Sequence, residues 1–241
     1  MNRALDDIVE LINDSCTPRT LKNILYLTKE ELENQIYRKN HKEENKKKAI
    51  EMSKEKKNVQ FGCGNHLIDG YINVDIVNPA DIIWDVRYDL PFNDRSIKQI
   101  FTEHMLEHID FPTSVNIFLE EAYRVLETGG KIIIGVPDCS LPLNDLENKN
   151  DSNRLEAIDK WYNHRTDVIE NMNNSMDYLN YVMRDQLFHE VYHAHFWGYT
   201  KENLTELLTK NGFKNIEIWK PDMQIINPKR LWGTLYLKGE K

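Results

Sequence analysis

Two short apolar runs, one ending at glycines and the next at an aspartate, constrain this fold most. The first is Val59–Phe61, followed by Gly62 and Gly64, and the second is Tyr71–Val74, followed by Asp75. They predict two buried strands and a tight turn, in which glycines adopt positive φ and leave room for a ligand. Open parallel sheets bind ligands outside the carboxyl ends of their strands, and a carboxylate accepts hydrogen bonds from ribose hydroxyls. The pair therefore predicts a site for a ribose-bearing cofactor, with a purely structural turn as the alternative.

Composition narrows the class of protein. The chain has 241 residues, 40% of them hydrophobic, which suits one large domain or a domain with an extension. It has no apolar run long enough to span a membrane, and its first residues lack the apolar region of a signal peptide. Its three cysteines are widely spaced, which argues against disulfides and thiolate zinc sites, and its net charge of −8 disfavours nucleic acid. We expect a cytoplasmic protein that binds neither membrane nor nucleic acid, and a homodimer stays open.

Residues 1–57 are predicted to form an N-terminal helical extension. Thr17 and Pro18 are typical of a helix start, and Thr28 begins a pattern with capping-box spacing that indicates a second start. The charged run Lys42–Lys57 indicates a solvated helix face, with a partner-binding or lid role as the less favoured interpretation.

Residues 58–241 are predicted to form one α/β domain with a doubly wound, mostly parallel seven-stranded sheet. An amphipathic helix is expected over Val115–Leu126, and only six residues separate Gly64 from Tyr71, too few for a crossover helix. The last two strands are expected to be antiparallel. The predicted strands are Val59–Phe61, Tyr71–Asp75, Ile82–Val86, Ile97–Thr102, Lys131–Val136, Ile216–Trp219 and Leu231–Leu237.

Residues 139–192 are too long for a plain connection, and they are polar, rich in asparagine and interspersed with aromatic side chains. We expect this insertion to form a mostly helical cap over the site. Thr200 then begins a helix whose apolar stripe includes Leu204 and Leu208.

The order of these motifs resembles the class I S-adenosylmethionine (SAM)-dependent methyltransferases, in particular a small bacterial group of the methyltransferase type 11 kind. The resemblance covers roughly residues 58–138 and 193–239. It is carried by Phe61–Gly64, Gly70–Asp75, Asp85, Asp89–Phe92, Glu103–His108 and Arg124–Lys131. It implies a Rossmann-like methyltransferase fold with SAM as cofactor.

The resemblance also implies roles for single residues. The glycines would pass under the methionine and ribose of SAM, Asp75 would hold the ribose hydroxyls, and Asp85 would meet the adenine amino group. Glu103 and His104 would lie next to the sulfonium. Gln60 stands where the family has an acidic residue, which departs from its pattern. The implied cofactor contacts are Phe61, Gly62, Gly64, Asp75, Ile76, Asp85, Val86 and Glu103.

Methyl transfer to an oxygen requires removal of a proton, and histidine suits this because its pKa lies near neutrality. His104 and His195 are the candidate bases, with structural histidines as the alternative. The expected acceptor is an oxygen or nitrogen of a small molecule or sugar. The candidate substrate contacts are His104, His108, Asp138, His193, His195 and Tyr199.

Two other functions compete with this one. His189–His193 matches the HExxH zinc signature and His104–His108 its inverted form, so a zinc hydrolase, or a metal that orients the acceptor, is weighed. The first match lacks a third ligand at the protease spacing, and we predict no metal. A protein that binds SAM or S-adenosylhomocysteine without catalysis is the other alternative.

Overall fold

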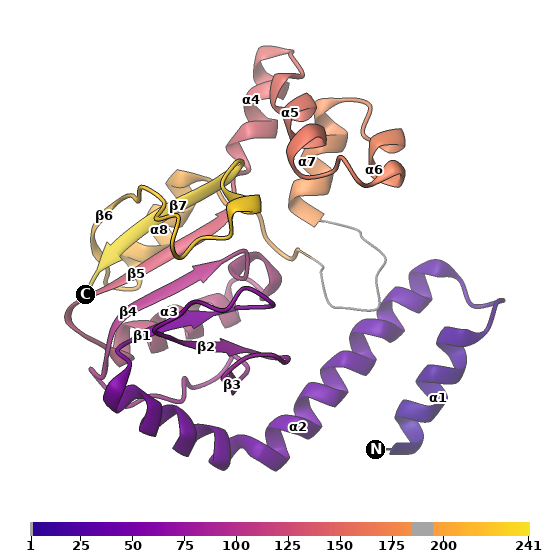
Figure 1. Cartoon of the computed structure of the whole chain (residues 1–241). Helices are drawn as coiled ribbons and strands as arrows, with labels where there is room; N and C mark the ends of the chain where they lie inside the picture. Colours follow the sequence, from indigo (N-terminus) through magenta and orange to yellow (C-terminus); the bar gives the residue numbers. More distant parts are fainter. Residues whose placement is uncertain (1, 185–194) are drawn as a thin grey trace.

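The computed structural model describes residues 2–184 and 195–241 (Figure 1). Its sheet has seven strands in the order β3-β2-β1-β4-β5-β7-β6, in which β1 to β5 are parallel and β7 is antiparallel to both its neighbours. The predicted fold class is therefore confirmed, including the terminal antiparallel pair. The strands are β1 Asn58–Phe61, β2 Tyr71–Asp75, β3 Ile82–Ile83, β4 Ile97–Glu103, β5 Leu126–Pro137, β6 Lys214–Ile218 and β7 Thr234–Glu240.

Helices cover one face of this sheet, run along its β2–β3 edge and extend beyond its carboxyl edge (Figure 1). The α-helices are α1 Asn2–Asn13, α2 Arg19–Glu55, α3 Thr113–Val125, α4 Ser140–Asn148, α5 Ser152–Lys160, α6 Thr166–Asn171, α7 Ser175–Arg184 and α8 Lys201–Lys210, and the 3-10 helices are η1 Leu106–His108 and η2 Pro228–Arg230. Between β1 and β2 there is only a loop, as the six-residue spacing predicted.

The two faces of the sheet are covered differently. On one face, strand residues such as Val59 and Ile134 join the apolar stripes of α3 and α8 in the main hydrophobic core. On the other, Phe101 and Tyr236 pack with Ile226 and Trp219, and the described members of that cluster come from strands and loops rather than helices. Each strand thus alternates between a helix-covered and a loop-covered face.

Helix α2 differs from the prediction. It is one continuous helix through Thr28, so the second helix start predicted there is wrong. The Thr28 hydroxyl donates instead to the carbonyl oxygen of Ile24 at 2.7 Å, as a threonine in mid-helix can. The carboxyl half of α2 packs along the β2–β3 edge, with Ala49 fully buried in the core.

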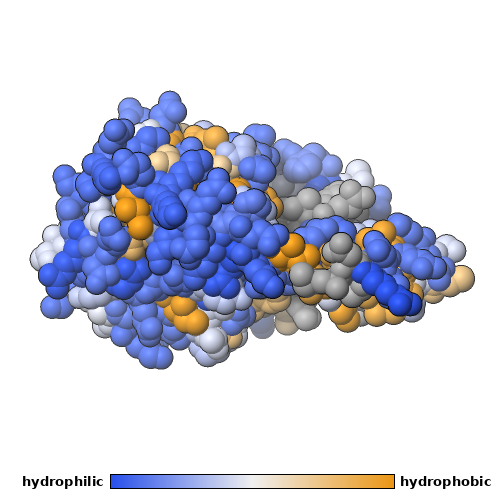
Figure 2. Space-filling view, turned by 90° about the horizontal axis from the view of Figure 1, so that it is seen from below, coloured by the Kyte–Doolittle hydropathy of each residue, from blue (hydrophilic) through white to orange (hydrophobic). Residues whose placement is uncertain are grey.

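Seen from below the view of Figure 1, the surface of the molecule is mostly hydrophilic, with hydrophobic residues in small separate groups (Figure 2). The charged run of α2 does not simply face solvent. Lys48 donates to the carbonyl oxygen of Asp81, and Lys56 to that of Tyr71 at 3.0 Å. No helix within the described ranges is both long and apolar enough to cross a membrane.

Helices α4 to α7 form the expected cap region, projecting from the carboxyl end of β5 (Figure 1). They share a small core of their own around Tyr178, Val168 and Met172, each almost fully buried. After the cap, α8 begins where the N–H of Thr200 donates to the side chain of Asn203 at 2.8 Å. The domain divisions at residues 57, 139 and 192 stay predictions.

Candidate active site

The loop after β1 brings the predicted glycines to the carboxylate of Asp75. The N–H of Gly62 donates to the carbonyl oxygen of Val74 at 2.9 Å, and that of Gly64 to Oδ2 of Asp75 at 2.7 Å. The other carboxylate oxygen accepts from the N–H of Ile76 at 2.7 Å. The two glycines have φ of 72° and 49°, a region that favours glycine. Asp75 is only half buried, so its remaining lone pairs can meet a ligand.

The two glycines have different surroundings. A Cβ on Gly62 would lie 2.4 Å from Cβ of Met105, whereas a Cβ on Gly64 would meet no described heavy atom within 4 Å. Gly62 is therefore needed for packing, and Gly64 borders open space. Phe61 is fully buried and packs edge-on against Phe118, so only its backbone can face a cofactor.

Asp85 is held by an arginine rather than open to a ligand. Its Oδ1 accepts from Nε of Arg87 at 3.0 Å and its Oδ2 from Nη2 at 2.8 Å. The same guanidinium binds both carboxylate oxygens of Glu31 on α2, at 2.6 and 2.8 Å. The predicted contact of Asp85 with adenine would have to share this carboxylate with Arg87. Val86 beside it is buried in the core, and the predicted strand Ile82–Val86 ends early, at Ile83.

A pocket lies between α2 and the carboxyl ends of β2 and β3. Its wall from the sheet includes Ile76, Trp84 and Asp85, and its wall from α2 includes Tyr37 and Lys42. Sequence reasoning missed the α2 residues, because the charged stretch carries no motif that distinguishes a docked face from a solvated one.

Glu103 faces away from the glycine loop. It is 2% exposed, and its Oε1 accepts a hydrogen bond from the Tyr236 hydroxyl at 2.5 Å. Its Oε2 accepts from the N–H of Asn227 at 3.2 Å, and its carbonyl oxygen from Arg230 at 2.9 Å. The side chain of Glu103 thus ties β4 to β7, and its predicted contact with the cofactor stays a prediction.

His104 follows β4 with a left-handed φ of 54°. Its Nε2 lies 2.7 Å from Oγ1 of Thr234, and its ring lies edge-on to Trp161. Its side chain is 14% exposed, and burial, together with the nearby Arg230, holds its pKa well below the ordinary value. A neutral imidazole can accept a proton, but this one is largely shielded from solvent.

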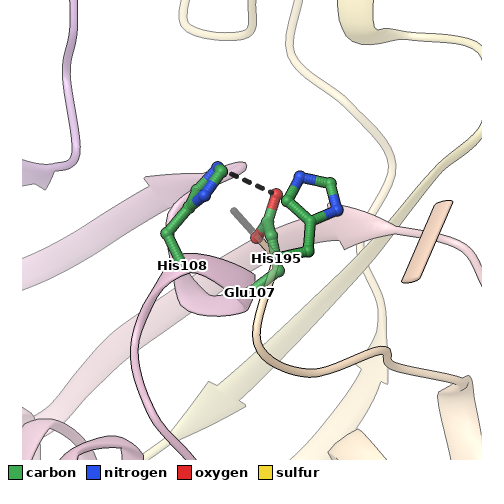
Figure 3. A group of neighbouring side chains, drawn as sticks. All are labelled: Glu107, His108 and His195. Atoms are coloured by element: carbon green, nitrogen blue, oxygen red, sulfur yellow. Dashed lines mark ion pairs between the residues drawn. The ribbon is translucent and has the colours of Figure 1, made fainter. Parts of the chain in front are cut away.

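Three side chains converge at the carboxyl end of β4, namely Glu107, His108 and His195, here called the Glu–His cluster (Figure 3). One ligand atom from each side chain, a nitrogen or an oxygen, lies within 4.8 Å of the other two. The carboxylate of Glu107 reaches between the two imidazole rings, which meet edge to face with centroids 4.8 Å apart (Figure 3). Burial raises the pKa of Glu107.

The inverted zinc motif does not have the helical geometry that its spacing suggested. His104 precedes a 3-10 helix of only three residues, so it does not share an α-helical face with His108. Glu107, the glutamate of that motif, instead joins His108 and His195 in the Glu–His cluster. His189–His193, and with it the predicted substrate contact His193, lies outside the described residues.

Asp138 and Tyr199 lie together just beyond β5. Oδ1 of Asp138 accepts from the N–H of Ser140 at 2.9 Å and from its hydroxyl at 2.6 Å, which supports the start of α4. Tyr199 pairs with Asp138 through a single β-bridge and is 1% exposed. Burial raises the pKa of the Tyr199 hydroxyl. Both residues lie at the base of the cap, Asp138 half buried and Tyr199 fully buried, and their predicted substrate contacts stay predictions.

Part of the sheet and the segment after β4 match a known protein family. Residues 73–134 match the family model of a methyltransferase domain. This segment contains Asp75, Asp85 and the stretch from Glu103 to His108. A comparison with curated proteins finds no match.

Solved structures of methyltransferases resemble this chain at low identity. One from Thermotoga maritima, described as a possible histamine N-methyltransferase, has 17% identity, a TM-score of 0.46 and coverage of 77% of this chain and 82% of its own. The Burkholderia thailandensis 1,6-didemethyltoxoflavin-N1-methyltransferase, with 1,6-didemethyltoxoflavin and S-adenosylhomocysteine bound, has 13% identity and a TM-score of 0.45. The match covers 76% of this chain and 70% of that one. A SAM-dependent methyltransferase from Archaeoglobus fulgidus has 15% identity and a TM-score of 0.42, and the match covers 88% of this chain and 94% of that one.

The sheet order and the matched domain define a class I methyltransferase fold. The resemblance seen in the sequence is confirmed by the family model, which matches residues 73–134 as a methyltransferase domain and supports an enzyme that uses S-adenosylmethionine as its cofactor.

Proposed function

We propose that this enzyme transfers the methyl group of SAM to an oxygen or nitrogen of a small-molecule or sugar acceptor. The observation that carries the proposal is the arrangement of polar groups at one edge of the sheet. Gly64 and Asp75 lie at the ends of β1 and β2, and the Glu–His cluster follows β4. In parallel sheets this edge is where cofactor and substrate bind side by side.

In this proposal the nucleoside half of SAM lies at the pocket next to Ile76, which would have to widen to admit it. Ribose hydroxyls would meet the carboxylate of Asp75, and adenine would enter between Ile76 and Trp84 and the facing side of α2. Lys42 already lies 5.9 Å from the centre of the Trp84 ring, so the wall offers both an aromatic surface and polar groups. The helix absent between β1 and β2 is thus replaced on this side by α2.

The methionine half then points toward β4, where the sulfonium would face the cluster. The acceptor lone pair forms the new bond to the methyl carbon, the S–CH3 bond breaks, and its electron pair stays on sulfur as S-adenosylhomocysteine. For a hydroxyl acceptor, the proton goes to a base. His195 suits this role better than His104, because His104 uses Nε2 on Thr234 and is largely buried.

Calorimetric titration with SAM and S-adenosylhomocysteine tests the cofactor site. The variant Asp75→Ala removes the carboxylate, and we expect at least a tenfold loss of affinity, since hydrogen bonds to a charged group contribute about 1.5–3 kcal/mol. Asp69→Ala is the matched control, because Asp69 is an exposed acid near the same loop. Equal affinity of the Asp75→Ala variant and the wild type would overturn the assignment of Asp75.

A screen of radiolabelled SAM against hydroxyl, amine and sugar acceptors tests the transfer itself. Labelled product from a small molecule supports the proposal. Tight SAM binding with no transfer across the whole screen would favour the non-catalytic binding protein instead.

A further inference from the structure

Glu107 is the most unusual buried polar group among the described residues. It is 1% exposed, and neither of its carboxylate oxygens has a hydrogen-bond partner there. Its Oε1 lies 3.7 Å from Nδ1 of His104 and 3.9 Å from Nε2 of His108, both beyond hydrogen-bonding distance. A buried carboxylate with no donor is costly, so such a group calls for an explanation.

The ring of His195 has one of its two nitrogens engaged by the backbone. Its Nδ1 lies 2.7 Å from the carbonyl oxygen of Val182 on α7. A carbonyl oxygen only accepts, so Nδ1 carries the hydrogen and donates it. Nε2 of the neutral ring is then left with its lone pair.

The same reasoning assigns the tautomer of His104. The Thr234 hydroxyl donates to the carbonyl oxygen of Arg230 at 2.5 Å, so its oxygen must accept from Nε2 of His104 at 2.7 Å. Nδ1 of His104, the atom that faces Glu107, therefore has no hydrogen. The carboxylate of Glu107 therefore faces at least one imidazole nitrogen that carries a lone pair, at a place where a positive charge would be stabilising.

We propose that Glu107, His108 and His195 bind a divalent transition-metal ion, with Nδ1 of His104 as a nearby further donor. Imidazole nitrogens with one carboxylate suit zinc, iron, cobalt or manganese, whereas magnesium and calcium prefer all-oxygen sites. The hydrogen bond from Nδ1 of His195 to a backbone carbonyl is the outer contact by which metal-binding histidines are usually oriented.

The spacing fits after a small contraction. With bonds of about 2.1 Å, two ligand atoms on one ion lie at most about 4 Å apart. Glu107 and His108 already satisfy this at 3.9 Å, while the whole set spans up to 4.8 Å. A movement of about 1 Å by His195 completes the site.

The inference deepens the proposed function and rests on it for its chemical role. A three-ligand site leaves positions open for an acceptor oxygen, and coordination lowers the pKa of a bound hydroxyl. The acceptor would lose its proton to water, attack the methyl carbon, and leave the S–CH3 electron pair on sulfur. His195 would then act as a ligand rather than as the base.

Metal binding is measured first without any reaction. Metal-free protein is titrated with Zn²⁺ by calorimetry and with Co²⁺ by visible absorption, and bound metal is counted by mass spectrometry. We expect one ion per chain, and affinity reduced by at least about tenfold in Glu107→Gln and in His195→Gln. His164→Gln is the control, because His164 is an exposed histidine on the cap, and it should leave affinity unchanged.

Thermal unfolding of each variant shows that it is folded before the titrations are compared. No stoichiometric ion in the wild type, or equal affinity in Glu107→Gln, would overturn the inference. SAM titration keeps the two proposals separate. SAM binding without metal binding would leave the proposed function standing and remove the metal site, and metal binding without SAM binding would do the reverse.

Discussion

Substituting the two glycines one at a time separates packing from ligand access in the loop after β1. Both residues have positive φ, so Gly62→Ala and Gly64→Ala each force a side chain into the left-handed region, at about 1–2 kcal/mol. Only the first substitution meets an obstacle, because its Cβ would lie 2.4 Å from Cβ and 2.5 Å from Cγ of Met105.

The clash sets the difference between the variants. Overpacking a core contact costs about 1–3 kcal/mol, because Met105 is 8% exposed and its Cβ cannot simply rotate away. We therefore expect Gly62→Ala to lower the free energy of unfolding by about 2–5 kcal/mol and Gly64→Ala by only about 1–2 kcal/mol. In a domain of this size, 1 kcal/mol corresponds to roughly 2–4 °C in Tm.

Ligand binding should show the opposite order. The methyl group of Gly64→Ala points into open space beside Asp75, where the proposed cofactor lies. SAM affinity should therefore fall more in Gly64→Ala than in Gly62→Ala, although Gly64→Ala is the more stable variant. Urea unfolding gives the free energies, and calorimetry gives the affinities at a temperature where both variants are folded. Equal destabilisation of the two variants would refute the packing argument, and unchanged SAM affinity in Gly64→Ala would refute the placement of the ligand.

Two further predictions concern other parts of the molecule. Arg87→Met should lower the free energy of unfolding by about 3 kcal/mol, because it leaves the carboxylate of Asp85 without its cation and the Asp85 side chain is only 6% exposed. Urea unfolding measures this loss, and a loss under about 0.5 kcal/mol would contradict the prediction. His104 predicts a pH dependence: its pKa is lowered by burial, so the unfolded chain takes up a proton below about pH 6.5 while the folded chain does not. Stability is thus fully present above that pH and falls as pH is lowered toward the folded pKa, by up to about 1.4 kcal/mol per pH unit. His104→Asn keeps a residue that tolerates positive φ and should show a shallower acid slope; an identical slope would refute the assignment.

The fold was predictable where local pattern and sheet geometry agree. The apolar runs that end at Gly62 and Asp75 had only one reasonable arrangement, two parallel strands whose ends meet, and the hydrogen bond from Gly64 to Asp75 follows from that arrangement. The short connection to Tyr71 likewise excluded a helix on length alone.

Residues that depend on long-range contacts were not predictable in this way. Glu31 pairs with Arg87 across 56 positions, and nothing in the charged sequence of α2 marks that one acid among its neighbours. Glu103 has the position expected for a cofactor contact, but its side chain direction is decided by Tyr236 on β7, which lies 133 residues away. Motif spacing fixes where a residue is in the chain, and only packing fixes where its side chain points.

The position of α2 gives these observations a common cause. The connection between β1 and β2 is a loop, so no helix from that connection can cover Ile76 and Trp84. Helix α2, which precedes the sheet in the sequence, covers them instead. That element docks through the buried Ala49 in its carboxyl half and, next to the pocket, through polar contacts in which Arg87 bridges Glu31 and Asp85. An apolar helix face would have filled the space next to Asp75, whereas polar contacts at a distance hold α2 in place and leave a pocket between them. The charged character of α2 thus allows the same helix to support the domain and to form one wall of the pocket where we propose that the cofactor binds.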